Sequence, residues 1–375
     1  MASPPAHLEP RVLRWARESF GLSVEEAAVR VNTTQERLEG AERGERNLTM
    51  RQVERAARVY ERPLAALFAP EPPEEEPQEA QFRRLPGAPE PPWPSEMIGL
   101  SRRVRERQEA AADLLDLLDE EPVWPEVNET LNAPPEAAAE MIRGRLGISL
   151  AEQASWRDRS GYAPLRHWVD AVEDLGVLVM HDGSLPVEVM RGFASLHPIV
   201  PAIVVNTQDD PRARVYTLIH ELGHLYQAER FDVANLEPWL EQFAGDVLMP
   251  LDALAEEVER IAIADGLRRF DEIALRFGVT PRAAVVRAAQ EELIAQEEAD
   301  EILGRISARG PRQRGGGGDY YWTKISRLSP AYTRLVFSAL ETQAVTYAAA
   351  SSLLGVKVGN FERMRGYLDR RAEMG

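Results

Sequence analysis

A stretch crowded with proline and glutamate divides this chain. Residues 69 to 95 read "APEPPEEEPQEAQFRRLPGAPEPPWPS". Proline lacks the backbone N–H that helices and sheets require, and neighbouring glutamates repel one another, so the stretch is predicted to be an extended linker. At 375 residues the chain is long enough for two or three hydrophobic cores. We therefore expect a modular protein, with one unit before the linker and the rest after it.

The composition limits how the protein can bind metal and nucleic acid. There is no cysteine, so any metal must be bound by His, Asp or Glu. No run approaches the roughly 18 consecutive apolar residues of a membrane span, and no secretory signal peptide is evident, so we expect a cytoplasmic protein. The net charge is −17, but residues 1 to 68 carry 11 arginines and 10 glutamates, a net charge of +1, which leaves −18 for the remainder. Contact with DNA is therefore expected only in the N-terminal part.

Residues 9 to 68 are predicted to form five short helices. Ser23 and Glu26 form a capping-box pattern, Gly21 and Gly44 suit helix ends, and Thr49 can cap a later helix. A helix, a short turn and a second helix form the layout in which the second helix enters the major groove. The segment resembles the XRE (lambda-repressor-like) helix-turn-helix family. An alternative is a small helical bundle for protein contacts, since three glutamates lie along the second helix. The DNA-contacting residues would be Thr33, Thr34, Gln35 and Arg37.

After the linker, the pattern predicts helices and a small sheet. Residues 96 to about 150 are strongly helical, and three strands are expected around 178–181, within 187–196 and at 201–206. This gives a mostly α protein with an α+β core. The strand at 201–206 is expected to be an edge to which a substrate peptide could add. Residues 311–318, "PRQRGGGG", are a predicted flexible break, and 319–375 a small helical module for packing or dimerisation.

The stretch "RVYTLIHELGHLYQAER", residues 214 to 230, contains the motif H-E-x-x-H. On a helix, His220 and His224 lie one turn apart on one face, so two imidazoles can bind one ion. Glu221 would then accept the proton of the attacking water. The alternative is a core helix that carries two histidines by chance. Tyr216 is predicted to pack on the opposite face, and His167, His181, His197 and Arg191 are more readily interpreted as structural.

The downstream segment "LEPWLEQFAGDVLMP" and the upstream "MRGF" and "PAIVVN" resemble the ImmA/IrrE family of zinc metallopeptidases. The resemblance covers most of residues 140 to 300 and predicts a peptidase domain over 96–310. It implies that Glu237 is the third metal ligand. Where the family usually has Asn or Asp, this chain has Glu241, which either orients a ligand histidine or is itself the ligand in place of Glu237. The ion would be Zn²⁺, although Mn²⁺ also suits these ligands.

Together the two resemblances are to fused XRE and ImmA/IrrE proteins of bacteria and phages. They imply a homodimeric, DNA-binding endopeptidase that cleaves a partner protein, such as a repressor or a toxin-system component, in a stress, prophage or defence circuit. The alternative is a transcription regulator or antitoxin whose peptidase-like domain senses a ligand or partner without cutting.

Overall fold

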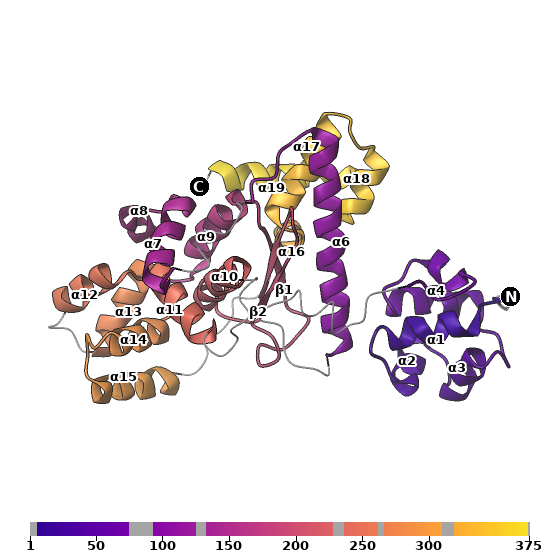
Figure 1. The fold of residues 1–375 in the computed structure, drawn as a ribbon, viewed down its shortest axis with the longest axis horizontal. Coiled ribbons are helices and arrows are strands. Elements are labelled where there is room, and N and C mark those ends of the chain that lie inside the picture. The colour runs from indigo at the N-terminus through magenta and orange to yellow at the C-terminus, as the bar shows by residue number, and fades with distance from the viewer. Residues whose placement is uncertain are drawn as a thin grey trace. The chain divides into compact units, whose positions relative to one another are not determined.

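The computed structural model describes residues 6–74, 93–124, 133–227, 236–261, 266–309 and 319–373. Most of the predicted linker and the glycine-rich break at 311–318 lie outside these residues. The described chain forms two compact units whose boundary falls within helix α6 (Ser95–Leu118), between residues 106 and 107. Figure 1 shows the elements of both units. Among the described residues, no helix combines the length and apolar character needed to cross a lipid bilayer.

The N-terminal unit contains the five predicted short helices. Ser23 and Thr49 each form a complete capping box, and Thr34 accepts a hydrogen bond from Arg37 N, so side-chain chemistry sets three of the helix starts. A buried ion pair links the first and third helices, with Arg17 Nε 2.7 Å from Glu42 Oε1. The helices are α1 (Pro10–Glu18), α2 (Val24–Val31), α3 (Gln35–Glu42), α4 (Met50–Val59) and the 3-10 turn η1 (Leu64–Phe68).

The second unit is built around a three-stranded sheet. Its strands are β1 (Leu178–Asp182), β2 (Gly192–Ser195) and β3 (Ala202–Asn206), in the spatial order β1-β3-β2. β3 pairs parallel to β1 and antiparallel to β2. The prediction that β3 is an edge strand was therefore wrong, because both of its sides are used for pairing. β2 and β1 are the edges.

The strand predicted within 187–196 is shorter than expected, because residues 187–189 form a turn. Asn206, at the end of β3, explains this. Its side-chain amide donates to the carbonyl oxygens of Leu185 and Met190, at 2.9 and 2.7 Å. These bonds hold the segment as a loop, and pairing begins only at Gly192.

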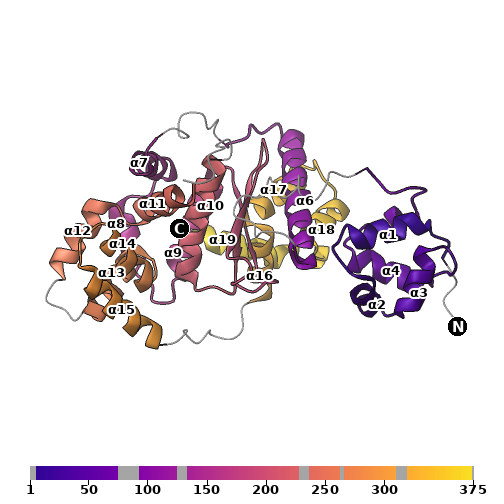
Figure 2. The same ribbon diagram turned by 60° about the horizontal axis from the view of Figure 1, so that its bottom comes forward.

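Helices cover both sides of the sheet. Figure 2 shows the strands between α10 on one side and α16 and α17 on the other. The large core joins the sheet, α9, α10 and the helical layer beyond them. The described helices of this unit after α6 are α7 (Pro135–Leu146), α8 (Leu150–Ser155), α9 (Tyr162–Asp174), α10 (Pro211–Tyr226), α11 (Leu236–Leu248), α12 (Leu251–Arg260), α13 (Gly266–Phe277), α14 (Pro281–Gln290), α15 (Gln296–Ala308), α16 (Tyr320–Leu328), α17 (Pro330–Glu341), α18 (Tyr347–Leu354), η3 (Val358–Asn360) and α19 (Phe361–Glu373).

The C-terminal helices are part of this unit and contact β1 through α16 and α17. Buried Glu173 of α9 accepts hydrogen bonds from the Ser329 hydroxyl and from Ala331 N, and lies 3.2 Å from Arg334 Nη2. The compact units thus divide the chain differently from the predicted domain boundaries at 96 and 319, which stay predictions. The predicted fold class, mostly α with an α+β core, is confirmed.

Candidate active site

Helix α10 carries the H-E-x-x-H motif. It begins after Asp210, whose carboxylate accepts a hydrogen bond from Arg212 N, and Pro211 occupies the first helical position. Both features favour a helix start. Its apolar face is buried in the core by Val215, Leu218, Ile219, Leu222 and Leu225. Burial of this face fixes the rotation of the helix about its axis, which sets the direction of the two histidines.

Three side chains converge at this helix. His220 Nε2 lies 3.4 Å from Glu237 Oε2, and His224 Nε2 lies 3.5 Å from Glu237 Oε1. One ligand atom from each of the three lies within 4.8 Å of the other two, and no other such trio occurs in the part of the chain that the structure describes. His224 is buried, whereas the Glu237 side chain is 60% exposed. The group is therefore accessible to solvent from the side of the glutamate.

The donor set fits a divalent cation. Neither ring nitrogen of buried His224 has a hydrogen-bond partner among the described residues. A buried polar atom without a partner costs about 1–3 kcal/mol. Two imidazoles and one carboxylate are the ligands of zinc sites that keep a position for water. A bound cation would thus satisfy a nitrogen that the protein itself leaves without a partner.

The charges within the group depend on one another. Burial is the largest influence and acts to lower the pKa of His220, but the hydrogen bond to Glu237 and the charges of the nearby glutamates together outweigh it, and the pKa is raised. Burial and the charge of His220 lower the pKa of His224 to about 4. The hydrogen bond from His220 lowers the pKa of Glu237. At neutral pH the group therefore presents a neutral His224 and an ionised Glu237, the forms that bind metal.

The side chain of Glu221, on α10, faces β2. It is buried, and Ala194 N of β2 hydrogen-bonds to its carboxylate, while Glu221 Oε2 has no partner among the described residues. Burial raises the pKa of Glu221 to about 8. Gly192 permits this approach, since a Cβ there would lie 2.5 Å from Thr217 Cγ2, 2.8 Å from Val204 O and 3.3 Å from Glu221 Cγ. The carboxylate is thus adjacent to the cation ligands and to the sheet edge.

The glycine of the motif positions the third ligand. A Cβ on Gly223 would lie 2.6 Å from Leu240 Cδ2 and 3.0 Å from Phe243 Cδ1, both on α11. Only a residue without a side chain allows α11 to pack this closely on α10. Glu237 is in the first turn of α11, three residues before Leu240. The close approach at Gly223 therefore brings Glu237 within reach of the histidines.

In the N-terminal unit, the residues predicted to contact DNA lie at the start of α3. Thr34 is its N-cap and Gln35 its first residue, and both are exposed. Arg37 Nη2 donates to Asn47 O at 3.2 Å, so its guanidinium also ties α3 to the next loop. The Thr33 hydroxyl is buried and has no partner among the described residues. Thr34 and Gln35 are thus the more accessible pair.

Comparison with known families decides the identity of both units. The helix-turn-helix domain model matches residues 11–68, and the model of the IrrE N-terminal-like domain, a peptidase family, matches residues 172–289. The chain thus contains a helix-turn-helix domain and an IrrE N-terminal-like domain. The predicted fusion is confirmed. Comparisons with curated proteins and with solved structures gave no match. The matched IrrE-like segment includes the sheet, α10 and α11, and hence all four residues of the candidate site.

Glu241 is not one of the three residues whose ligand atoms converge. Its side chain is exposed, and among the described residues the trio of cation ligands includes Glu237 and not Glu241. The backbone carbonyl of Glu241 accepts a hydrogen bond from the Tyr216 hydroxyl at 2.9 Å. The prediction for Tyr216 was wrong in its helical phase: Tyr216 is four residues before His220, so both lie on one face. Tyr216 holds α11 against α10 from that face.

Three of the remaining candidate side chains of the second unit have structural partners. His197 Nδ1 accepts hydrogen bonds from Ile199 N and Val200 N, at 3.2 and 3.0 Å. His167 stacks on Trp156, with ring centroids 4.4 Å apart. Arg191 pairs with Asp209 at 2.7 Å. None of these three side chains belongs to the trio of cation ligands.

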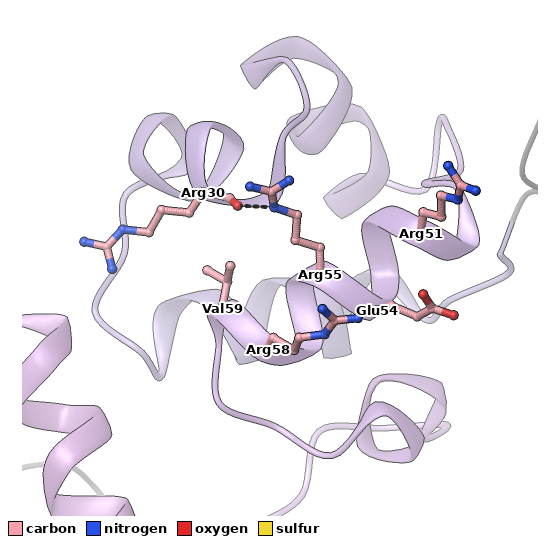
Figure 3. Close-up of a pocket in the computed structure, with 6 residues that line it drawn as sticks. All are labelled: Arg30, Arg51, Glu54, Arg55, Arg58 and Val59. Carbon is pink, nitrogen blue, oxygen red and sulfur yellow. Dashed lines mark hydrogen bonds between the residues drawn. The ribbon is translucent and has the colours of Figure 1, made fainter. Parts of the chain in front are cut away.

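The helix-turn-helix domain has an arginine patch that the sequence analysis did not identify. Figure 3 shows it around a surface pocket on α2 and α4, and it consists of Arg30, Arg51, Arg55 and Arg58. All four are exposed, and Arg55 Nε donates to Arg30 O at 2.8 Å, at the end of α2 that leads into α3. Arginines at 51, 55 and 58 recur at the spacing of one helix face, so periodicity alone would have revealed them.

Proposed function

We propose that the chain is a zinc-dependent endopeptidase that binds duplex DNA through its helix-turn-helix domain and cleaves a partner protein. The convergence of His220, His224 and Glu237, with buried Glu221 beside them, is the observation that supports this most strongly. The match to a peptidase family supports the reaction class. Zinc is the proposed ion because two imidazoles and a carboxylate are typical of catalytic zinc sites.

In this proposal His220, His224 and Glu237 hold the cation. When bound, the ion would supply Lewis-acid chemistry, polarising the scissile carbonyl and lowering the pKa of water. Glu221 accepts a proton from the attacking water and returns it to the amine that leaves. Its position suits this role, because Glu221 lies beside the cation ligands on α10 and is held against β2 by the hydrogen bond from Ala194 N.

The substrate would bind as an extra strand on β2. Ala194 N points to Glu221 on α10, and β2 pairs with only one strand, so the outer edge of β2 lies next to the general base. An extended peptide on this edge would bring its backbone to Glu221 and to the cation ligands. β2 thus replaces β3 as the proposed docking edge.

Duplex DNA would contact Thr33, Thr34, Gln35 and Arg37 at the start of α3. The arginine patch would add contacts to backbone phosphates, since Arg55 bonds to the Arg30 carbonyl at the end of α2 that leads into this helix, although the Arg30 guanidinium itself pairs with Glu96. A near-neutral domain gains little affinity from its overall charge, so we propose a homodimer that reads a two-fold site. The partner cleaved would be a repressor or a toxin-system component of the same circuit.

The test is a comparison of new protein N-termini in cells that express the wild type or Glu221→Gln. Loss of a general base lowers a rate by roughly 10²- to 10⁴-fold. We expect cleavage products only with the wild type, and zinc content and DNA binding unchanged in the variant. If both proteins produce the same N-termini and the same transcriptional output, the chain is a regulator that does not cut, and the peptidase proposal is wrong.

A further inference from the structure

We propose that a second cavity, in the unit that contains the IrrE-like domain and near the start of α10, before the H-E-x-x-H motif, binds a nucleotide. The cavity has a volume of about 850 Å³ and lies between α9, the ends of β1 and β3, the start of α10, and the C-terminal helices α16 and α19. This volume is within the range of small-molecule sites, about 300–1,000 Å³. We call it the interhelix cavity.

The charge of its lining points to an anionic ligand. Five arginines and two aspartates line the cavity, with no lysine or glutamate, so the lining carries a formal charge of +3 in a chain whose net charge is −17. Guanidinium groups are the preferred partners of phosphate in proteins. The arginines are Arg166, Arg214, Arg327, Arg370 and Arg371.

Both aspartates are already engaged by the protein. Asp158 accepts hydrogen bonds from Ser160 N and Ala163 N and from the Ser160 hydroxyl. Asp319 caps α16 through Tyr321 N and Trp322 N and accepts a bond from the Tyr367 hydroxyl. These bonds hold the carboxylates in the wall of the cavity. They do not neutralise the arginines by direct pairing.

The arginines form two groups. Arg214 and Arg371 are buried and fixed: Arg214 donates to Thr207 O and Asp209 O, and Arg371 Nε lies 2.7 Å from Asp170 Oδ1. Arg327 and Arg370 are exposed, and the Arg370 guanidinium lies against Tyr367, to whose side chain it hydrogen-bonds. Buried Arg214 gives the cavity a fixed positive charge, whereas Arg371 is paired with Asp170, and the exposed pair can move to meet a phosphate.

Aromatic rings also line the interhelix cavity, where a nucleotide base could stack. Trp322 and Tyr367 line the cavity from α16 and α19, and Tyr162, which is 58% exposed, lines it from α9. Arg371 Cζ lies 5.4 Å from the centre of the Trp322 ring, and Arg370 Cζ lies 4.4 Å from the centre of the Tyr367 ring. Rings beside guanidinium groups suit a planar base that carries phosphate, because stacking and charge act on adjacent parts of one ligand.

The position in the fold supports the same conclusion. His181 near the end of β1 and Thr207 directly after β3 line the cavity, and β1 and β3 are parallel. Ligands bind beyond the carboxyl ends of parallel strands in many α/β proteins. Helix α10 begins at the cavity with Arg214 and reaches the proposed cation ligands from His220 onward. The cavity therefore uses a different end of the same helix.

The experiment is isothermal titration of the full chain with ATP, ADP, AMP and GTP, and separately with inorganic phosphate. We expect at least one nucleotide to bind with a Kd below about 100 μM. The double substitution Arg327→Ala with Arg370→Ala should weaken binding at least tenfold, because charge-assisted hydrogen bonds to phosphate are lost. Trp322→Leu should weaken nucleotide binding severalfold and leave phosphate binding unchanged. Arg363→Ala, an exposed position on α19 outside the cavity, should have no effect.

Three results would overturn the proposal. One is the absence of nucleotide binding at millimolar concentration in a protein whose thermal unfolding is normal. The other is nucleotide binding that survives the Arg327 and Arg370 substitutions but is lost with Arg51→Ala and Arg55→Ala, which would place the nucleotide on the DNA-binding domain. Binding of phosphate with the same affinity as nucleotides, insensitive to Trp322→Leu, would also contradict a base-binding site.

Discussion

Gly223 of α10 and Leu240 of α11 are in direct contact, so that a Cβ on the glycine would lie 2.6 Å from Leu240 Cδ2. Leu240 and Phe243, the two side chains that meet Gly223, are fully buried and cannot swing aside into solvent. The distance between the two helices is therefore set at this glycine. Since Glu237 belongs to α11 and the histidines to α10, the same contact controls the spacing of the proposed cation ligands.

Gly223→Ala tests this relationship. An extra methyl in a filled core costs about 1–3 kcal/mol, and moving α11 should weaken metal affinity by roughly tenfold. Urea unfolding and zinc titration measure the two effects. Gly144→Ala is the control, because a Cβ there meets no atom within 4 Å, and alanine should stabilise α7 by about 0.5–1 kcal/mol. Equal behaviour of the two variants would show that the glycine does not set the helix spacing.

The arginine patch predicts a change in the salt dependence of DNA binding. Each lost phosphate contact lowers the slope of log K against log salt by about 0.9, so Arg51→Ala with Arg55→Ala should reduce it by up to about 2. Affinity should fall similarly for all duplex sequences, because phosphate contacts do not read bases. Fluorescence anisotropy at several salt concentrations measures both quantities.

The control for the patch is Arg43→Ala. Arg43 caps the far end of α3 and pairs with Glu45, with Nε 2.9 Å from Oε1. Its removal should leave the salt slope unchanged. An unchanged slope in the Arg51 and Arg55 variant as well would show that the patch does not lie on DNA.

His181 predicts a pH dependence of stability. Burial, with the charges of Arg214 and Arg371, lowers the pKa of His181 to about 3. In the unfolded chain the pKa of His181 is about 6.5. Below that pH, and above about pH 3, the unfolded state therefore binds a proton at His181 and the folded state does not. Stability is therefore lost as pH falls from 6.5 toward 3. Between pH 7 and pH 5 this one group should remove about 2 kcal/mol of unfolding free energy.

The measurement compares urea unfolding of the wild type and His181→Gln at pH 5, 6 and 7. Other titrating groups are common to the two proteins, so the difference between the two pH profiles isolates His181. We expect the variant to have the flatter profile. Parallel profiles would mean that His181 is protonated in the folded protein.

Local chemistry explains which parts of this structure could be predicted. Ser23, Thr34 and Thr49 cap helices through bonds to residues three positions away, so short sequence windows contain the information. The spacing of His220 and His224 on one helix is local in the same way. Strand order depends on contacts between distant residues. β3 is the central strand because it pairs with β1, which ends some 20 residues before it, and no feature of 201–206 predicts this pairing.

Long-range packing also decided the details of the candidate site. The position of Glu221 against β2 depends on Gly192 and Ala194, which the motif does not include. The interhelix cavity lies between α9 and helices that begin about 160 or more residues later, α16 and α19. Its arginines recur at no regular spacing in the sequence. The wrong face predicted for Tyr216 did not come from long-range packing. Tyr216 and His220 are four residues apart, so helix geometry alone places both on one face of α10.

The most direct test of the account is zinc binding by three proteins: the wild type, Glu237→Gln and Glu241→Gln. Both substitutions replace an exposed glutamate on α11 by its isosteric amide, so they form a matched pair. Mass spectrometry under native conditions and titration of the metal-free protein measure the stoichiometry and affinity. We predict one zinc ion per chain in the wild type and Glu241→Gln, and an affinity at least about tenfold weaker in Glu237→Gln. A wild type that takes up no stoichiometric metal, or equal affinities of the two variants, would contradict the proposed centre.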